Sequence, residues 1–159
     1  MPTPTTPRAG TVSRRRPRTN PEIVGGVWHG RTVRHEHLVQ LRWSDPDSLG
    51  HVNHARALSL FEDARIAMSD GLPGRGMILA RLEVDYLRQL YYRAGERLVV
   101  SSWVTRLGTK SLSVRQELVQ DGQVGIRVDV VLVTFDFATD ASRPLDDVER
   151  EHWSRLLEE

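Results

Sequence analysis

Apolar and polar side chains alternate over five stretches of the chain, and this period of two predicts β-strands. The predicted strands are His35–Trp43, Ile78–Leu90, Arg97–Leu107, Ser111–Gln120 and Gln123–Ala138. Short turn-like connections at 93–96, 108–110 and 121–122 indicate that the last four strands follow one another as antiparallel neighbours. The stretch 130–137 is almost wholly apolar, which predicts a central strand covered on both faces.

The alternation also assigns side chains to faces. In the first predicted strand, Val39, Leu41 and Trp43 share one half-buried face. In the second, one face consists of Ile78, Ala80, Leu82, Val84 and Tyr86. Because Tyr86 belongs to this regular pattern, core packing is its expected role.

A spacing of three and four residues predicts a helix over 55–70. Its buried stripe is Leu58, Phe61, Ala64, Arg65 and Met68. Asn53 is the expected N-cap, and Gly71 with Pro73 forms a stop signal. Near the C-terminus, 144–157 predicts a shorter helix. The side chains on one side of it are Val148, His152, Trp153 and Leu156.

This order of elements predicts an α+β fold, in which an antiparallel sheet of about five strands wraps around one long central helix. The 159 residues suit one domain, which we place at 26–159 together with the C-terminal helix. Residues 1–25 are rich in Pro, Thr and Arg, and we expect them to form a disordered basic tail. The free face and edges of the sheet favour a homodimer or homotetramer.

Composition excludes several classes of function. The chain has no cysteine, which rules out disulfides, thiolate zinc sites and a cysteine nucleophile, and fits a cytoplasmic location. Basic charge is concentrated in the short tail rather than on the body of the domain, so we expect no nucleic-acid binding by the domain. RNA association through residues 1–25 stays an alternative, and deletion of these residues would abolish it. No apolar run approaches the roughly 20 residues of a membrane span, and the N-terminus has no secretory signal, so we expect no membrane association.

The densest cluster of polar and ionisable residues lies at 43–54, between the first strand and the start of the long helix. A helix start offers unpaired N–H groups and a partial positive charge to a developing oxyanion. An aspartate beside it can act as a nucleophile or as a general base. The alternative is an ordinary loop, in which Asp45 and Asp47 stabilise turns and Asn53 caps the helix.

The stretch 42–65, RWSDPDSLGHVNHARALSLFEDAR, resembles the signature of the hotdog-fold acyl-CoA thioesterases of the 4-hydroxybenzoyl-CoA thioesterase type. That family has an R-x-x-D-x-D-x-x-G-H-V-N loop that runs into a long central helix, often with an F-E-x-A-R segment. Segments 81–98 and 108–136 are similar to its strands, so the resemblance covers about 33–147. It implies a hotdog fold and an enzyme that hydrolyses an acyl-CoA thioester without a cofactor.

The resemblance also implies catalytic roles. Asp47, the second aspartate of D-x-D, is expected to attack the thioester carbonyl or to activate a water. The main chain of His54 is expected to form the oxyanion hole, and Gly50 to let the backbone approach the substrate closely. His51 matches a histidine that the related plant acyl-carrier-protein thioesterases use beside Asp and Asn. Leu49 replaces that Asn, which argues against a base role for His51.

In the family, coenzyme A usually lies at a dimer interface with its phosphates at the surface. This implies Arg88, Arg93 and Lys110 as candidate phosphate ligands and Ser111 as a hydrogen-bond donor. Tyr86 could orient the substrate. For each cation, the alternative is an ordinary solvated surface residue.

Two other classes of site lack support in the sequence. His35 and His37 share one face of a predicted strand, as a metal pair requires, but no third ligand is in register, so we expect no metal site. A serine-hydrolase elbow and a glycine-rich phosphate loop are both missing. Two alternatives keep the fold: a noncatalytic acyl-CoA-binding protein, and an enoyl-thioester hydratase or dehydratase, whose Asp/His arrangement the sequence does not show.

Overall fold

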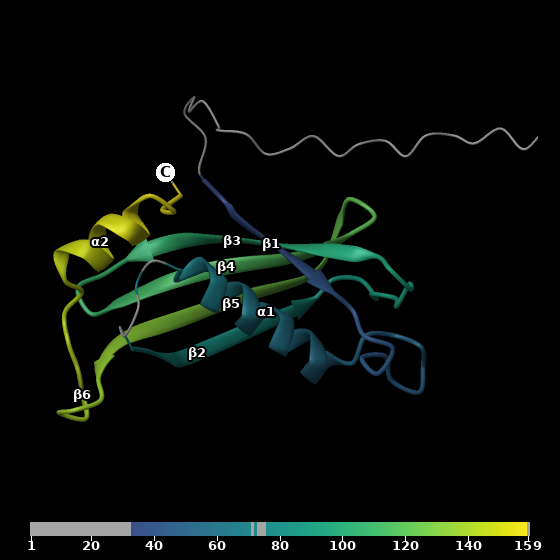
Figure 1. Ribbon diagram of the computed structural model, residues 1–159, viewed down its shortest axis with the longest axis horizontal. Helices are drawn as coiled ribbons and strands as arrows, with labels where there is room; N and C mark the ends of the chain where they lie inside the picture. Colours follow the sequence, from purple (N-terminus) through teal and green to yellow (C-terminus); the bar gives the residue numbers. More distant parts are fainter. Residues whose placement is uncertain (1–32, 71, 73–75, 159) are drawn as a thin grey trace, which may run out of the picture. The chain divides into compact units, whose positions relative to one another are not determined.

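The computed structural model describes residues 33–70, 72 and 76–158, in which a twisted antiparallel sheet packs against one long helix (Figure 1). The elements are β1 (His35–Gln40), α1 (His54–Met68), β2 (Met77–Tyr86), β3 (Arg97–Leu107), β4 (Ser111–Gln120), β5 (Gln123–Asp136), β6 (Ala141–Ser142) and α2 (Asp147–Ser154). This is the expected α+β arrangement. The predicted tail and the predicted stop residues Gly71 and Pro73 lie outside the described residues.

The strands are ordered β1-β3-β4-β5-β2, and the two-residue β6 also pairs with β5. The turns at 108–110 and 121–122 join antiparallel neighbours, as predicted. The prediction that β2 and β3 are neighbours is wrong, because β2 pairs with β5. β2 already ends at Tyr86, so the connection is the whole of 87–96. That segment must span three strand spacings, about 14 Å, whereas the ends of a compact turn lie within about 7 Å of each other.

Helix α1 forms because Asn53 caps it and because its apolar side chains recur at helical spacing. The side chains that it buries against the inner face of the sheet are Ala57, Phe61, Ala64 and Met68. Phe61, Ala64 and Met68 of the predicted stripe are thus confirmed as buried, whereas Leu58 and Arg65 are only half-buried and Ala57, outside the prediction, is buried. Contacts of α1 are mainly with β3 and β1, and the inner face of the edge strand β2 is only partly covered: Leu82 and Val84 are half-buried against the core.

β1 and β2 both end earlier than the alternation of apolar and polar residues predicts. β1 ends at Gln40, and a turn at Arg42–Asp45 carries Trp43 out of the sheet, so that 84% of it is exposed. In β2 an irregularity between Leu79 and Arg81 shifts the register. Leu79 therefore joins Leu82 and Val84 on the inner face. The predicted core packing of Tyr86 is wrong, since it is 53% exposed at the end of this edge strand.

Two further predictions about the second half of the chain need correction. β5 is an internal strand as expected, but only its inner face is buried; Val131 and Val133, on the outer face, are half-buried. In α2 the buried side chains are Glu149 and Trp153, whereas Val148 is exposed. The register is shifted because Asp146 starts the helix through a capping box with Glu149.

No helix among the described residues is both long enough and apolar enough to cross a membrane.

Candidate active site

The loop that precedes α1 is a small, tightly bonded hairpin. Asp45 is buried, and its carboxylate accepts a hydrogen bond from the N–H of Arg42 at 2.6 Å. Pro46 and Val52 then pair across the loop, and the N–H of Asn53 donates to the carbonyl of Asp45 at 2.9 Å. The expected structural role of Asp45 fits these contacts, because its side chain and main chain hold both ends of the loop.

Asp47 lies at the turn of this hairpin. Its N–H donates to the carbonyl of His51 at 2.8 Å, and its Oδ1 accepts from the N–H groups of Leu49 and His51 at 2.8 and 3.3 Å. Gly50 closes the turn with φ of 80°, a left-handed conformation that favours glycine. Oδ2 of Asp47 has no hydrogen-bond partner among the described residues, and the side chain is exposed. One carboxylate oxygen is thus fixed by the loop and the other is available.

Helix α1 begins directly after this hairpin, at His54. The Oδ1 of Asn53 accepts from the N–H of Ala55 at 2.9 Å and, more weakly, from that of Arg56 at 3.4 Å. The N–H of Ala57 donates to the carbonyl of Asn53. The N–H of His54 has no acceptor in the part of the chain that the structure describes. A free main-chain donor therefore remains at the positive end of the helix dipole.

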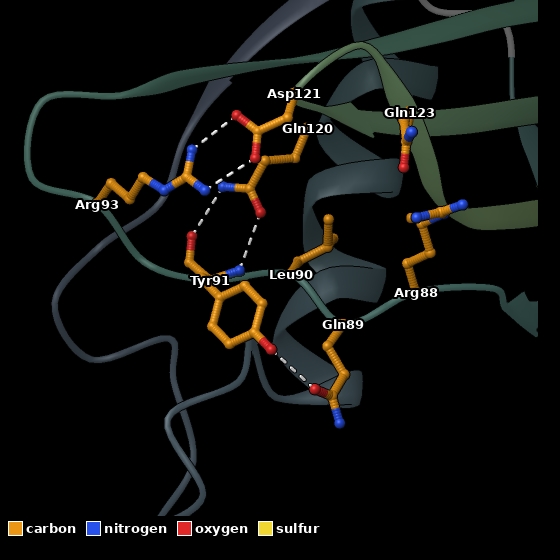
Figure 2. Close-up of a pocket in the computed structure, with 9 residues that line it drawn as sticks. Arg88, Gln89, Leu90, Tyr91, Arg93, Gln120, Asp121 and Gln123 are labelled. Atoms are coloured by element: carbon orange, nitrogen blue, oxygen red, sulfur yellow. Dashed lines mark hydrogen bonds and ion pairs between the residues drawn. The ribbon is translucent and has the colours of Figure 1, made fainter.

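A pocket of about 250 Å³ lies beside this loop, and a second one of about 360 Å³ adjoins it. They share a wall made of Arg88, Gln89 and Leu90 (Figure 2). The smaller pocket is also lined by His51 and Tyr86. The loop and the wall are bonded to each other, because the N–H of Val52 donates to the carbonyl of Leu90 at 2.9 Å.

The far end of the larger pocket is rigid. Gln120 is buried, and its side-chain amide bonds both main-chain groups of Tyr91: its Oε1 accepts from the N–H at 3.0 Å and its Nε2 donates to the carbonyl at 2.9 Å (Figure 2). Next to it Arg93 forms a two-pronged ion pair with Asp121, at 2.7 and 2.8 Å. Hydrogen bonding to Arg93 lowers the pKa of Asp121 below its usual value.

The structure therefore divides the predicted substrate-binding residues into three groups. Arg88 and Tyr86 line the pockets, and the guanidinium of Arg88 has no hydrogen-bond or ion-pair partner among the described residues. Arg93 also lines the larger pocket, but its charge is already paired with Asp121. Lys110 and Ser111 lie at the opposite end of the sheet, where Nζ of Lys110 donates to the carbonyl of Ser142. Within a single chain, Lys110 and Ser111 therefore lie away from both pockets.

The residues predicted to be catalytic are close in the chain. Asp47, Gly50 and His51 share one turn, and His54 begins the helix that follows. Of these four, His51 lines the pocket, and its ring meets that of Tyr91 edge-on at 5.2 Å. The group can supply a carboxylate, a main-chain donor and an adjacent cavity, which are the parts that acyl transfer requires.

Residues 41–152 match the family model of the thioesterase-like superfamily. The match includes the loop, α1 and most of the sheet, and it decides the identity. The chain belongs to this superfamily.

Solved structures place this thioesterase-like protein in the hotdog fold that its sequence predicts. A thioesterase from Thermus thermophilus, complexed with coenzyme A and zinc, is 32% identical; the match covers 81% of this chain and 97% of that one, with a TM-score of 0.68. A predicted thioesterase from Bacillus stearothermophilus is 28% identical over 79% of this chain and 97% of its own, with a TM-score of 0.72. Comparison with curated proteins finds no match.

A third relative supports the fold alone. A thioesterase-superfamily protein from Jannaschia sp. CCS1 is 24% identical over 84% of this chain and all of its own, with a TM-score of 0.73. The Thermus structure contains zinc, whereas among the described residues here no three histidine, aspartate or glutamate side chains are arranged so that they could hold a metal ion.

Sequence reasoning missed one polar group in this thioesterase-like fold. Arg65, Gln116 and Ser102 meet beneath α1: Arg65 donates to Oε1 of Gln116 at 3.0 Å, and Nε2 of Gln116 donates to Oγ of Ser102 at 3.0 Å. Gln116 and Ser102 are fully buried. The available signal was that each of these polar residues occupies an inward position in an otherwise apolar pattern.

Proposed function

We propose that this protein is a thioester hydrolase that cleaves an acyl-CoA to the free acid and coenzyme A, with Asp47 as its essential carboxylate. The observation that carries this proposal is the state of the loop: Oδ1 of Asp47 is held by two main-chain amides, whereas Oδ2 has no partner among the described residues, and His51 of the same turn lines a pocket. Within the superfamily, we assign it to the 4-hydroxybenzoyl-CoA thioesterase type because its loop carries the D-x-D pattern of that family.

Two routes use the same carboxylate. Asp47 attacks the thioester carbonyl, expels the thiolate of coenzyme A and forms an anhydride that water then hydrolyses. Alternatively, Asp47 removes a proton from a water that attacks the carbonyl directly. In both routes the carbonyl oxygen becomes negative, and the free N–H of His54 would donate to it at the helix start. Gly50 and His51 then border the reacting group, and His51 acts as a wall of the pocket rather than as a base.

The unpaired Arg88 is the best-placed cation for a phosphate of coenzyme A, since Arg93 is already paired. Coenzyme A is present in the Thermus structure, which supports a coenzyme A thioester as the substrate. Tyr86, exposed at the mouth of the smaller pocket, would contact the acyl or pantetheine part.

We also propose a homodimer that pairs the edges of the two β2 strands. No described strand pairs with the outer edge of β2, and Leu79, Tyr86 and Leu87 are exposed there. Antiparallel pairing about a two-fold axis sets the ends of the two sheets side by side, so that Lys110 and Ser111 of one copy could reach the pockets of the other. Light scattering tests this: a mass of one chain, 18.1 kDa, would contradict it.

Replacement of Asp47 by Asn tests the catalytic proposal. Thiol release from a panel of acyl-CoA thioesters should fall about 10³-fold or more, because the charged catalyst is lost while its shape is kept. Full turnover by a folded D47N variant would remove the proposed role. Tight acyl-CoA binding without thiol release would favour the noncatalytic alternative, and loss of enoyl absorbance without thiol release would favour a hydratase. A cytoplasmic location, which the lack of cysteine suggests, completes the proposal.

A further inference from the structure

A third pocket, of about 180 Å³, lies beside the C-terminal half of α1 and contains a partly buried arginine. Ile66, Leu79 and Leu132 supply apolar walls, and Arg65 and Glu62 supply the charges. Arg65 is held in place because it donates to Oε1 of Gln116 at 3.0 Å.

The partner of Arg65 is itself fixed. Nε2 of Gln116 donates to the carbonyl of Phe61 at 3.1 Å and to Oγ of Ser102 at 3.0 Å, so the amide cannot turn away. A neutral amide oxygen is the only hydrogen-bond acceptor that the described residues give to the Arg65 guanidinium. The guanidinium has five N–H groups, so several donors remain for a ligand.

The charge of Arg65 is not neutralised by direct contact. No carboxylate among the described residues lies within 4.0 Å of it, which sets it apart from Arg93, Arg115, Arg127 and Arg143. Burial lowers the pKa of Arg65, and the nearby Glu62 partly offsets this. Glu62 is exposed at the rim of the pocket, so its charge is screened by solvent more than that of Arg65.

This pocket and the one beside His51 lie at the two ends of the inner face of β2. Tyr86 lines the pocket beside His51, and Leu79 lines the pocket that contains Arg65. Leu82 and Val84 lie between these two residues on the same face of the strand. This face is apolar, and Leu82 and Val84 on it are half-buried against the core. An acyl chain that starts at the loop and runs along β2 to Arg65 would contact only apolar side chains of that face.

The distance to be covered can be estimated from helix geometry. His54 and Arg65 are eleven residues apart, about 16 Å along the helix. An arginine side chain extends about 6 Å and leans toward the helix N-terminus, which leaves about 10 Å. At about 1.2 Å per bond, an acyl chain of roughly eight carbons spans this gap.

We infer that Arg65 recognises an oxygen acceptor at the far end of a medium-length acyl group, and that a terminal carboxylate is its preferred partner. The inference rests on the proposed function, because it takes the thioester to lie at the start of α1. A charged acceptor is preferred because the guanidinium lacks a countercharge in contact, and charge-assisted hydrogen bonds are the stronger ones.

Substrate preference is the first test. We expect the wild-type protein to hydrolyse the coenzyme A monothioester of octanedioic acid with kcat/KM about tenfold or more above that of octanoyl-CoA. Replacement of Arg65 by Met should reverse this preference, and R65K should keep part of it. Arg81→Met is the matched control, since Arg81 lies on β2 but on the outer face, and it should leave the preference unchanged. Equal or lower activity of wild-type protein on the dicarboxylic substrate overturns the inference.

Binding of the free acids is a second test that does not need turnover, and it covers the case in which R65M fails to fold. NMR titration of the wild-type protein should show octanedioate bound about tenfold more tightly than octanoate, with shifts at α1 and β2. Failure to distinguish the two acids overturns the inference, even if acyl-CoA hydrolysis is observed. Selective binding without any hydrolysis supports the role of Arg65 and refutes the thioesterase proposal instead.

Discussion

Replacement of Gly50 by Ala should separate the backbone requirement of the catalytic loop from its contact with substrate. Gly50 has φ of 80°, and apart from its two chain neighbours no described residue has an atom within 4 Å of a Cβ built there. Alanine is therefore opposed by backbone strain alone. A left-handed conformation costs an L-residue about 1–2 kcal/mol, and the stiffer unfolded chain recovers about half a kcal/mol. We expect a net loss of about 1 kcal/mol, or about 3–6 °C in Tm for a domain of this size.

The open space around Gly50 leads to a separate expectation for activity. Since no protein atom occupies it, a methyl group there would project beside Asp47, where the proposed substrate lies. G50A should therefore lower kcat/KM by more than its small loss of stability explains. G50N should recover most of the Tm, because Asn tolerates this conformation, but it should not recover kcat/KM.

The assay combines thermal unfolding with thiol release, and Gly95→Ala is the matched control. Gly95 has φ of 78° and is equally free of neighbours, but it lines neither of the site pockets. G95A should lose similar stability and keep its KM. An unchanged Tm in G50A beside a lowered Tm in G95A would refute the strain argument. Equal kcat/KM in wild type, G50A and G50N would show that substrate does not approach this turn.

Three other predictions concern separate parts of the chain. Arg88→Met should raise KM for coenzyme A thioesters about tenfold but leave it unchanged for N-acetylcysteamine thioesters, which have no phosphates; an equal rise for both would be contrary to a phosphate contact. Glu149→Ala should lower the free energy of unfolding, measured by chemical denaturation, by about 2–4 kcal/mol, because it leaves Arg143 without its two-pronged buried partner. The control Val148→Ala, at an exposed position, should lower it by less than about 0.5 kcal/mol. Burial, together with the nearby His37 and His152, lowers the pKa of His35. As the pH drops, the unfolded chain therefore takes up a proton at His35 before the folded chain does, and stability should fall as the pH drops through about 6.5. Tm measured at pH 7.5 and 5.5 should fall less in His35→Gln than in the wild type; an equal fall would exclude His35 as the cause.

The bounds of the two inner strands β3 and β4 could be predicted from the sequence, whereas the C-terminal ends of the edge strands β1 and β2 could not. β3 and β4 have the predicted bounds, because each has a neighbour on both sides and a steady buried face. β1 and β2 are edge strands, where one ladder of hydrogen bonds fixes the end of the strand less firmly. Apolar and polar residues therefore do alternate beyond Gln40 and beyond Tyr86, but the two strands end at these residues. A local pattern also does not show that β2 pairs with β5.

The same limit applies to the candidate site. Asn53 as the helix cap and the bonded turn around Asp47 are local features, and their residue types indicate them. The pairing of Arg93 with Asp121 joins residues far apart in the chain, so no local pattern indicates that this cation is already engaged. The contact of Arg65 with Gln116 is equally remote. Which cations are available to a ligand becomes apparent only in three dimensions.

The bonds that Gln120 makes to Tyr91 have a consequence for the rate of ligand capture. Both main-chain groups of Tyr91 are held by a buried side chain of β4, and the adjacent Leu90 is bonded to Val52. The wall shared by the two site pockets is therefore in position before a ligand arrives, and little conformational entropy is lost there on binding. Observed association rates should then rise linearly with ligand concentration and show no plateau from a slow opening step.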